Sequence, residues 1–185
     1  PLSERNMKVD FIIGNHDTYY KNTNEVNSLR ELGLNEQYDN FNVIWEPTEK
    51  TYDSCKIMLM PWICSGNYDE CMRATNETSA QVLFGHLELK GFEMQRGIVN
   101  DHGFDSNLFG KFDIVCSGHY HHKSSHNNIS YLGSPYEIFW SDYDDPRGFH
   151  IFDTETREIE FIRNPNRIFH KIWYDDMDKS MDEII

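Results

Sequence analysis

Apolar runs that end abruptly at glycine predict the main strands of this chain. The β-branched run 8–13 stops at Gly14, the run 80–84 stops at Gly85, and the run 111–116 stops just before Gly118. Short apolar runs bounded by turn residues are typical of strands that are buried on both faces. The same criteria predict further strands over residues 42–45, 56–62 and 129–132.

Helical spacing and turn residues predict the remaining elements. Residues 24–37 have helical spacing of apolar positions with Asn24 as the cap, and residues 67–75 predict a second, shorter helix. Segments 147–153 and 158–162 flank a turn and predict a hairpin, 167–174 predicts a further strand, and 87–103 predicts a functional loop. Helices alternate with strands early and strands follow one another later, which predicts an α/β (α+β) fold with a mixed sheet or sandwich.

Composition narrows the class of protein. The chain has 185 residues, 38% of them hydrophobic, and no apolar run approaches the roughly 18 residues of a membrane span. The formal net charge of −14 argues against strong autonomous binding to DNA, although metal ions or a basic partner could meet the phosphates instead. The four cysteines form no CxxC motif, so we expect them to be buried thiols in a reducing cytoplasm.

Three of the predicted strands end in glycine followed by side chains that bind metals. These ends read Gly14-Asn15-His16-Asp17, Gly85-His86 and Gly118-His119-Tyr120-His121. Glycine lets the backbone turn at a strand end, where side chains point into a cleft at the sheet edge. Imidazole and amide oxygen are good ligands for zinc, iron or manganese. We interpret the other five histidines as surface or core residues: His102, His122, His126, His150 and His170.

These strand ends resemble the last three motifs of the calcineurin-like metallophosphoesterases. Segments 131–135, 145–149 and 152–155 are similar to nuclease subunits of the SbcD and Mre type, above all the recombination endonuclease subunits of T-even-like phages. The resemblance covers residues 9–162. It implies a β-sandwich flanked by helices and incomplete at its N-terminus. Residues 1–163 would be the C-terminal portion of a nuclease domain, and 164–185 the start of a cap domain or a tail.

The resemblance also implies a role for each motif residue. Asn15, His86 and His119 match the ligands of one metal ion, and His121 matches a ligand of the other. His16 matches the residue that touches the scissile phosphate and helps to expel the leaving oxygen, with Asp17 orienting it.

The resemblance further implies cofactors, partners and a cellular location. The cofactors would be two divalent ions, manganese by preference, with zinc or iron as alternatives. The partners would be DNA, an ATPase subunit of the SbcC or Rad type and a second copy of the chain. The location would be the cytoplasm of a bacterial cell or phage-infected host, with no membrane attachment.

The chain departs from the family in one respect. The first two family motifs, Asp-x-His and Gly-Asp-x-x-Asp, would precede Gly14, and neither occurs in the 13 residues before it. We therefore expect a fragment of a metal-dependent DNA phosphodiesterase whose second metal site is incomplete and which is inactive alone.

Two other functions stay open from the sequence. A phosphoprotein or nucleotide phosphatase of the same fold is favoured by the acidic charge, whereas the 131–135 and 145–149 segments favour the nuclease. A non-catalytic scaffold is permitted by the missing motifs, but the intact Asn15-His16-Asp17 argues against it.

Overall fold

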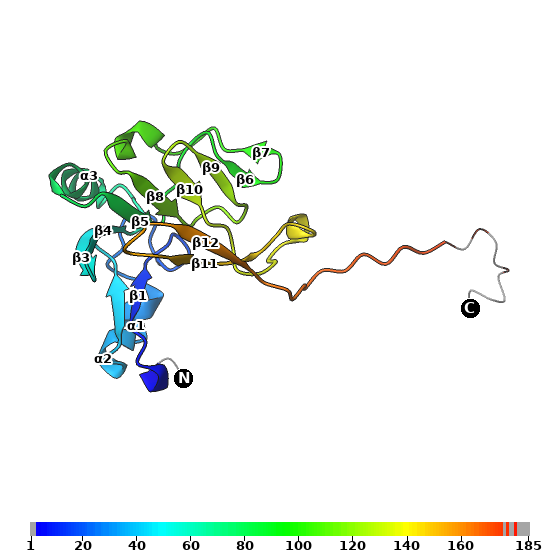
Figure 1. Ribbon diagram of the computed structural model, residues 1–185, viewed down its shortest axis with the longest axis horizontal. Coiled ribbons are helices and arrows are strands. Elements are labelled where there is room, and N and C mark those ends of the chain that lie inside the picture. Colours follow the sequence, from blue (N-terminus) through cyan, green and yellow to red (C-terminus); the bar gives the residue numbers. More distant parts are fainter. Residues whose placement is uncertain (1–2, 176, 178–179, 181–185) are drawn as a thin grey trace.

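Parallel strands form the centre of the main sheet. The computed structural model describes residues 3–175, 177 and 180, and it is a mixed α/β structure with few helices (Figure 1). The six-stranded sheet has the order β3-β4-β5-β8-β10-β9, in which β4, β5, β8 and β10 are parallel and the two edge strands are antiparallel. Its strands are β3 (Thr48–Tyr52), β4 (Cys55–Met60), β5 (Val82–Gly85), β8 (Ile114–Ser117), β9 (Ser124–His126) and β10 (Ile129–Tyr131).

Smaller elements surround this sheet. Three two-stranded pairs are β1 (Val9–Ile12) with β2 (Phe41–Ile44), β6 (Glu93–Gln95) with β7 (Ile98–Val99), and β11 (Gly148–Phe152) with β12 (Ile159–Arg163). The α-helices are α1 (Ser28–Glu31), α2 (Leu34–Gln37) and α3 (Tyr68–Glu77), and 3-10 turns span Ser3–Arg5, Ser106–Phe109 and Trp140–Asp142. In the described part of the chain, no helix is long and apolar enough to cross a membrane.

The parallel strands end in register. Met60 pairs with Gly85, Gly85 with Ser117, and Ser117 with Tyr131, so the last residues of four strands lie in one row. The ladder continues one residue further, where the N–H of His86 donates to Met60 and the N–H of Gly118 donates to Gly85. Residues that follow β5 and β8 therefore leave the sheet at the same edge.

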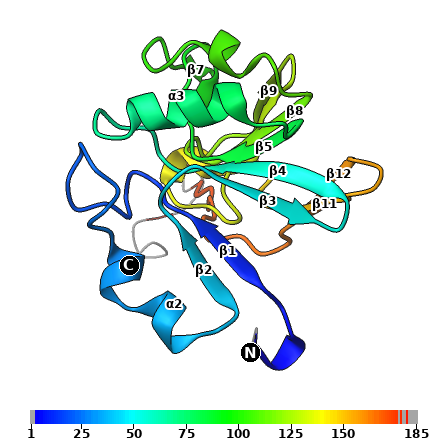
Figure 2. The same ribbon diagram turned by 90° about the vertical axis from the view of Figure 1, so that its left-hand side faces the viewer.

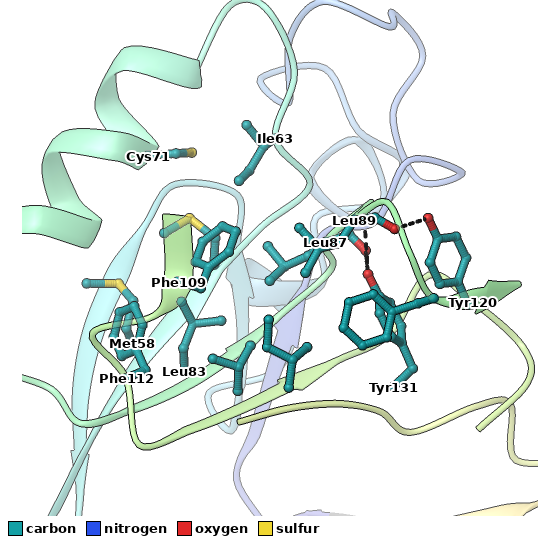
Figure 3. Packing of buried hydrophobic residues seen from close by; sticks show 14 of the residues in the cluster. Met58, Ile63, Cys71, Leu83, Leu87, Leu89, Phe109, Phe112, Tyr120 and Tyr131 are labelled. Atoms are coloured by element: carbon teal, nitrogen blue, oxygen red, sulfur yellow. Dashed lines mark hydrogen bonds between the residues drawn. The ribbon is translucent and has the colours of Figure 1, made fainter. Parts of the chain in front are cut away.

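The main sheet is covered on both faces. One face packs against α3 and the 3-10 turn before β8, in a core that includes Phe109, Leu83 and Tyr131 (Figure 3). The other face packs against the β1–β2 pair and the β11–β12 hairpin, with Phe84 and Phe152 edge to face at 5.1 Å (Figure 2). Strands with two buried faces read as continuous apolar runs, which is why β4, β5 and β8 were predicted from the sequence.

The predicted α/β class and mixed sheet are confirmed, and so is the 147–162 hairpin. All four cysteines are unpaired and buried, as expected. The polar edge strands β3 and β9 were not predicted, because one side of an edge strand faces solvent and its sequence carries little apolar signal.

The predicted helix over residues 24–37 is wrong in extent. Only two single turns form, and they are separated by Gly33 in the left-handed conformation at φ 62°. The cap is Asn27, whose side-chain oxygen accepts from the N–H of Arg30 at 3.0 Å. The predicted cap, Asn24, is buried instead and donates to the carbonyl of Trp62 at 2.8 Å.

The predicted strand over residues 167–174 is also wrong. This segment is extended but pairs with no strand in the described part of the chain. The N–H groups of Ile168 and Phe169 donate instead to the buried carboxylate of Glu137, at 2.7 and 2.8 Å. Burial alone would raise the pKa of Glu137, but these two donors outweigh it and lower the pKa. Within the proposed cap or tail segment, residues 176, 178–179 and 181–185 lie outside the described residues.

Asp10 fastens the β1–β2 pair to the main sheet. Its carboxylate accepts from the ammonium of Lys50 and from the hydroxyl of Tyr52 at 2.6 Å, both on β3, and from Asn42 on β2 at 3.0 Å. Burial raises the pKa of Asp10, but these hydrogen bonds and the Lys50 charge outweigh it, so the pKa lies below its usual value.

We predict that Asp10→Asn lowers the free energy of unfolding by about 1–3 kcal/mol at pH 7. Because the pKa of Asp10 is lowered on folding, its contribution is present above the ordinary carboxyl pKa of about 4 and is lost as the pH falls through the folded-state value. Urea unfolding at pH 7 and pH 3 measures this. The control Asp113→Asn removes an exposed ion pair with Arg157 and should change stability by less than about 0.5 kcal/mol. Equal effects at both pH values would contradict the assignment.

The outer edge of β1 is open. β1 pairs with β2 alone, and the N–H groups of Val9 and Ile13 point to β2, so Asp10 and Ile12 direct their backbone groups to the other side. We predict that the 185-residue chain associates through this edge, because unpaired strand edges template pairing. Sedimentation should show a concentration-dependent mass, and the amides of Asp10 and Ile12 should gain protection from hydrogen exchange as concentration rises. A monomer at all concentrations would contradict this prediction.

Candidate functional site

Three of the predicted metal-binding side chains meet at the ends of β1, β5 and β8. The Oδ1 of Asn15 lies 2.9 Å from the Nε2 of His86, which lies 3.2 Å from the Nδ1 of His119. The two imidazole rings meet edge to face, with centroids 5.1 Å apart. Side chains from three separate strand ends therefore present their donor atoms to one another.

Two glycines leave the space that the His86 ring occupies. A Cβ on Gly14 would lie 2.7 Å from the Cε1 of His86 and 2.9 Å from its Nδ1, closer than such contacts occur. A Cβ on Gly118 would lie 3.4 Å from the same Nδ1. The glycines that mark the strand ends in the sequence are therefore needed for the close approach of a ring as well as for the turn.

Backbone geometry at the first and third strand ends aims the ligating side chains. The carboxylate of Asp17 accepts from the N–H of Gly14 at 2.8 Å, and the N–H of Asp17 donates to the carbonyl of Gly14 at 3.1 Å. Asp17 thus closes the turn that presents Asn15, and no hydrogen bond joins it to His16 among the described residues. His119 adopts φ 77°, a left-handed conformation that costs free energy in a residue other than glycine and is frequent at functional sites.

Two buried tyrosines hold the segment after His86. The hydroxyl of Tyr131 donates to the carbonyl of Leu87 at 2.9 Å and accepts from the N–H of Leu89 at 3.1 Å (Figure 3). The hydroxyl of Tyr120 donates to the carbonyl of Leu89 at 2.8 Å. Because these partners are buried, the chain leaving His86 is held in a single path.

Burial keeps the imidazoles neutral. Desolvation, aided by the nearby His119, His16 and His121, lowers the pKa of His86 to about 3. Burial also lowers the pKa of His119, against an opposing effect of Glu88, whose carboxylate lies 3.9 Å from the Nε2 of His119. Neutral imidazole is the form that binds metal ions, and ligating histidines commonly face a carboxylate with their second nitrogen.

The donor atoms of Asn15, His86 and His119 suit a cation. If the Nε2 of His86 carries a proton, it can donate to Asn15, and its contact with His119 is then poor; without the proton, it faces the lone pairs of the Asn15 oxygen. Atoms bound about 2.1 Å from an octahedral ion lie roughly 3 Å apart, close to the spacing seen. In the described part of the chain, however, no three His, Cys, Asp or Glu side chains are grouped to hold a metal ion.

The other predicted residues lie around this cluster. His121 lines a small hollow of about 160 Å³ with His119, and its ring stacks on Phe139 at 5.4 Å. Burial lowers the pKa of His121. His16 is exposed and lines a different hollow, of about 580 Å³, with Asp17. The structure thus joins Asn15, His86 and His119 directly and leaves His16 and His121 on two sides of them.

A buried ionic network supports His121, and the sequence analysis missed it. Arg147 donates to Asp142 at 2.8 Å, to Asp145 at 2.7 Å and to the hydroxyl of Ser134 at 3.0 Å. The N–H of Ser134 donates to the backbone carbonyl of His121 at 3.1 Å.

The same network reaches the neighbouring side chains. The Asp142 carboxylate accepts from the N–H of Phe139 at 3.0 Å, which fixes the residue whose ring stacks on His121. The Nδ1 of His122, which was expected to be a surface or core residue, lies 2.7 Å from Asp145. The Asp-Pro-Arg-Gly run at 145–148 was the available sequence signal.

Comparison with known proteins places the chain among relatives of nuclease subunits. No protein-family model matches it. The chain is homologous to exonuclease subunit 1 of Enterobacteria phage T4, with 37% identity over 173 residues, which are 94% of this chain and 50% of that protein.

More distant similarity extends to two bacterial proteins. They are the nuclease SbcCD subunits D of Staphylococcus saprophyticus, at 32% over 45% of this chain and 24% of the relative, and of Staphylococcus epidermidis, at 28% over 49% and 27%. The chain therefore spans about half the length of the phage relative and about a quarter of the bacterial ones.

We predict that Gly14→Ala destabilises the fold by about 1–3 kcal/mol, because the new methyl group must displace the His86 ring from a packed site. Urea unfolding measures the loss, and the NMR signals of the His86 and His119 rings should move with it. Gly110→Ala is the matched control, since φ is −66° there and the nearest atom to a new Cβ is 3.3 Å away. Undisturbed imidazole signals in Gly14→Ala would contradict this packing argument.

Proposed function

We propose that the chain is part of a divalent-metal-dependent DNA phosphodiesterase, an exonuclease or endonuclease subunit that acts in recombination and repair. The observation that carries this proposal is the meeting of Asn15, His86 and His119 at three strand ends, in a homologue of a phage exonuclease subunit. As in the subunit names of its relatives, it would work within a complex. We propose DNA, an ATPase subunit and a second copy of the chain as its partners.

In this proposal the residues have distinct roles. Asn15, His86 and His119 hold one divalent ion, and His121 contributes to a second, within a metallophosphoesterase-type sandwich. When bound, such ions supply Lewis-acid activation of the phosphate ester and of water. His16 contacts the scissile phosphate and protonates the leaving oxygen, and Asp17 fixes the turn that presents Asn15 and His16. Manganese is our first choice of ion, with zinc and iron as alternatives.

Exposed aromatic residues beside His16 favour a nucleic acid over a phosphoprotein. Tyr19 and Tyr20 are 79% and 51% exposed, their rings meet edge to face at 4.8 Å, and both line the hollow that contains His16. Nucleobases of a single strand stack on aromatic side chains without the need for a basic surface. This suits a chain with a net charge of −14.

We predict that the 185-residue chain alone, supplied with manganese, hydrolyses DNA little or not at all, because His121 is the only residue assigned to the second ion. Fusion to the upstream segment of the phage T4 relative should produce nuclease activity. His16→Ala in the fusion should lower kcat at least about 100-fold, as expected for loss of a general acid. Release of nucleotides from linear duplex and single-stranded DNA measures the activity.

The control is His102→Ala in the same fusion, because the His102 side chain is 86% exposed and lies in none of the hollows described around the site. Activity equal to that of the parent is expected. Hydrolysis of phosphopeptides or mononucleotides without DNA cleavage would replace the nuclease by the phosphatase alternative. A fusion that binds manganese but is inactive on all three substrates would favour the scaffold.

A further inference from the structure

We propose a second ligand site, for a phosphate group, in the hollow between strands β9 and β10 and the β11–β12 hairpin. The hollow has a volume of about 390 Å³ and lies where the hairpin passes beside these strands (Figure 1). Lys123, Ser125, Ser130 and His150 supply its polar lining, and Ile159 and Phe161 its apolar wall. None of these residues belongs to the Asn15–His86–His119 cluster, and the site does not depend on the proposed nuclease activity.

The ammonium group of Lys123 has no counterion in the described part of the chain. Its Nζ lies 3.1 Å from the centroid of the Phe161 ring, and no hydrogen bond or ion pair involves it there. The side chain crosses Gly133, where φ is 73° and a Cβ would lie 2.9 Å from the Cγ of Lys123. The absence of a side chain at position 133 thus lets the lysine lie across the backbone and hold its charge beside the hollow.

Two serine hydroxyls on adjacent strands provide a further donor. Ser125 on β9 and Ser130 on β10 are directly opposite in the pairing register, and their hydroxyl oxygens lie 3.0 Å apart. One of the two hydroxyl protons makes this bond, which leaves the other available to a ligand. Lys123 is two residues before Ser125, so its side chain leaves the sheet on the same face.

The charges around the hollow favour an anion despite the acidic composition of the chain. Arg147 and Arg163 are the other cations that act on Lys123, and Asp145 is the carboxylate that opposes them. Asp145 is already engaged by Arg147 at 2.7 Å and by His122 at 2.7 Å. The imidazole of His150, in contact with the Phe161 ring at 5.1 Å, can add an N–H donor.

Phosphate matches this combination of a cation, a hydroxyl and an N–H donor, because its several oxygens accept from all of them at once. The volume also exceeds that of a bare ion and lies within the range of ligand pockets, about 300–1,000 Å³. The phosphate could therefore be a free ion or part of a nucleotide or a nucleic-acid strand. The chemistry of recognition is the same, and the ligand competition below separates these sources.

The test is an NMR titration of the 185-residue chain with inorganic phosphate, at an ionic strength held constant with sodium chloride. We expect saturable shifts of the Ser125, Ser130 and Leu132 amides. Lys123→Met should weaken binding at least about tenfold, Lys123→Arg should stay within about threefold of the parent, and Ser130→Ala should weaken binding without altering the Lys123–Phe161 contact. Lys90→Met is the matched control, because it removes the same charge from a lysine already paired with Asp105 at 3.0 Å.

The competition uses thymidine 5′-monophosphate and a short oligothymidylate. Displacement of phosphate by the oligonucleotide would support a site for a nucleic-acid strand, and displacement by the mononucleotide alone would support a site for a free nucleotide. Shifts that do not saturate, or that respond equally to Lys123→Met and Lys90→Met, would overturn the proposal. Unfolding midpoints of Lys123→Met and Ser130→Ala confirm that each variant is folded, and loss of binding confined to an unfolded variant counts against the site.

Discussion

The candidate site depends on how closely the His86 ring can approach the backbone at Gly14. Strand β1 ends beside β5 only because no Cβ stands between them, and the ring fills the space that a side chain would need. The in-register ends of β4, β5 and β8 then bring His119 to the other side of the same imidazole. Displacing the ring would separate Asn15 from His119 without breaking any strand of the main sheet.

This constraint explains which parts of the site could be predicted from the sequence. Glycine at a strand end is visible as a residue, and the register of parallel strands follows from their buried, apolar runs. Asn15, His86 and His119 could therefore be grouped before the structure was known. The role of Asp17 could not, because hydrogen bonding to the Gly14 N–H depends on a turn geometry that the bare motif does not specify.

The parts that escaped prediction have in common that distant polar groups determine them. Arg147 is buried because two carboxylates and a serine hydroxyl surround it, a condition that hydrophobic patterning cannot register. The segment 167–174 has strand-like composition, yet a single carboxylate takes the backbone donors that a neighbouring strand would have used. The polar edge strands escaped for the related reason that solvent accepts half of their side chains. Local pattern thus identified the centre of the main sheet, whereas long-range ionic contacts decided its margins.

The attachment of residues 168 and 169 to Glu137 has a mechanical consequence. Glu137 is two residues before Phe139, whose ring stacks on His121, and Asp142 clamps the same short turn through two N–H groups. The extended segment that leaves the molecule is therefore in series with the aromatic contact at His121 (Figure 1). Tension applied to this segment from beyond residue 174 would first load the Glu137 carboxylate and then tilt the ring against the imidazole, so the segment acts as a tether with a stiff anchor.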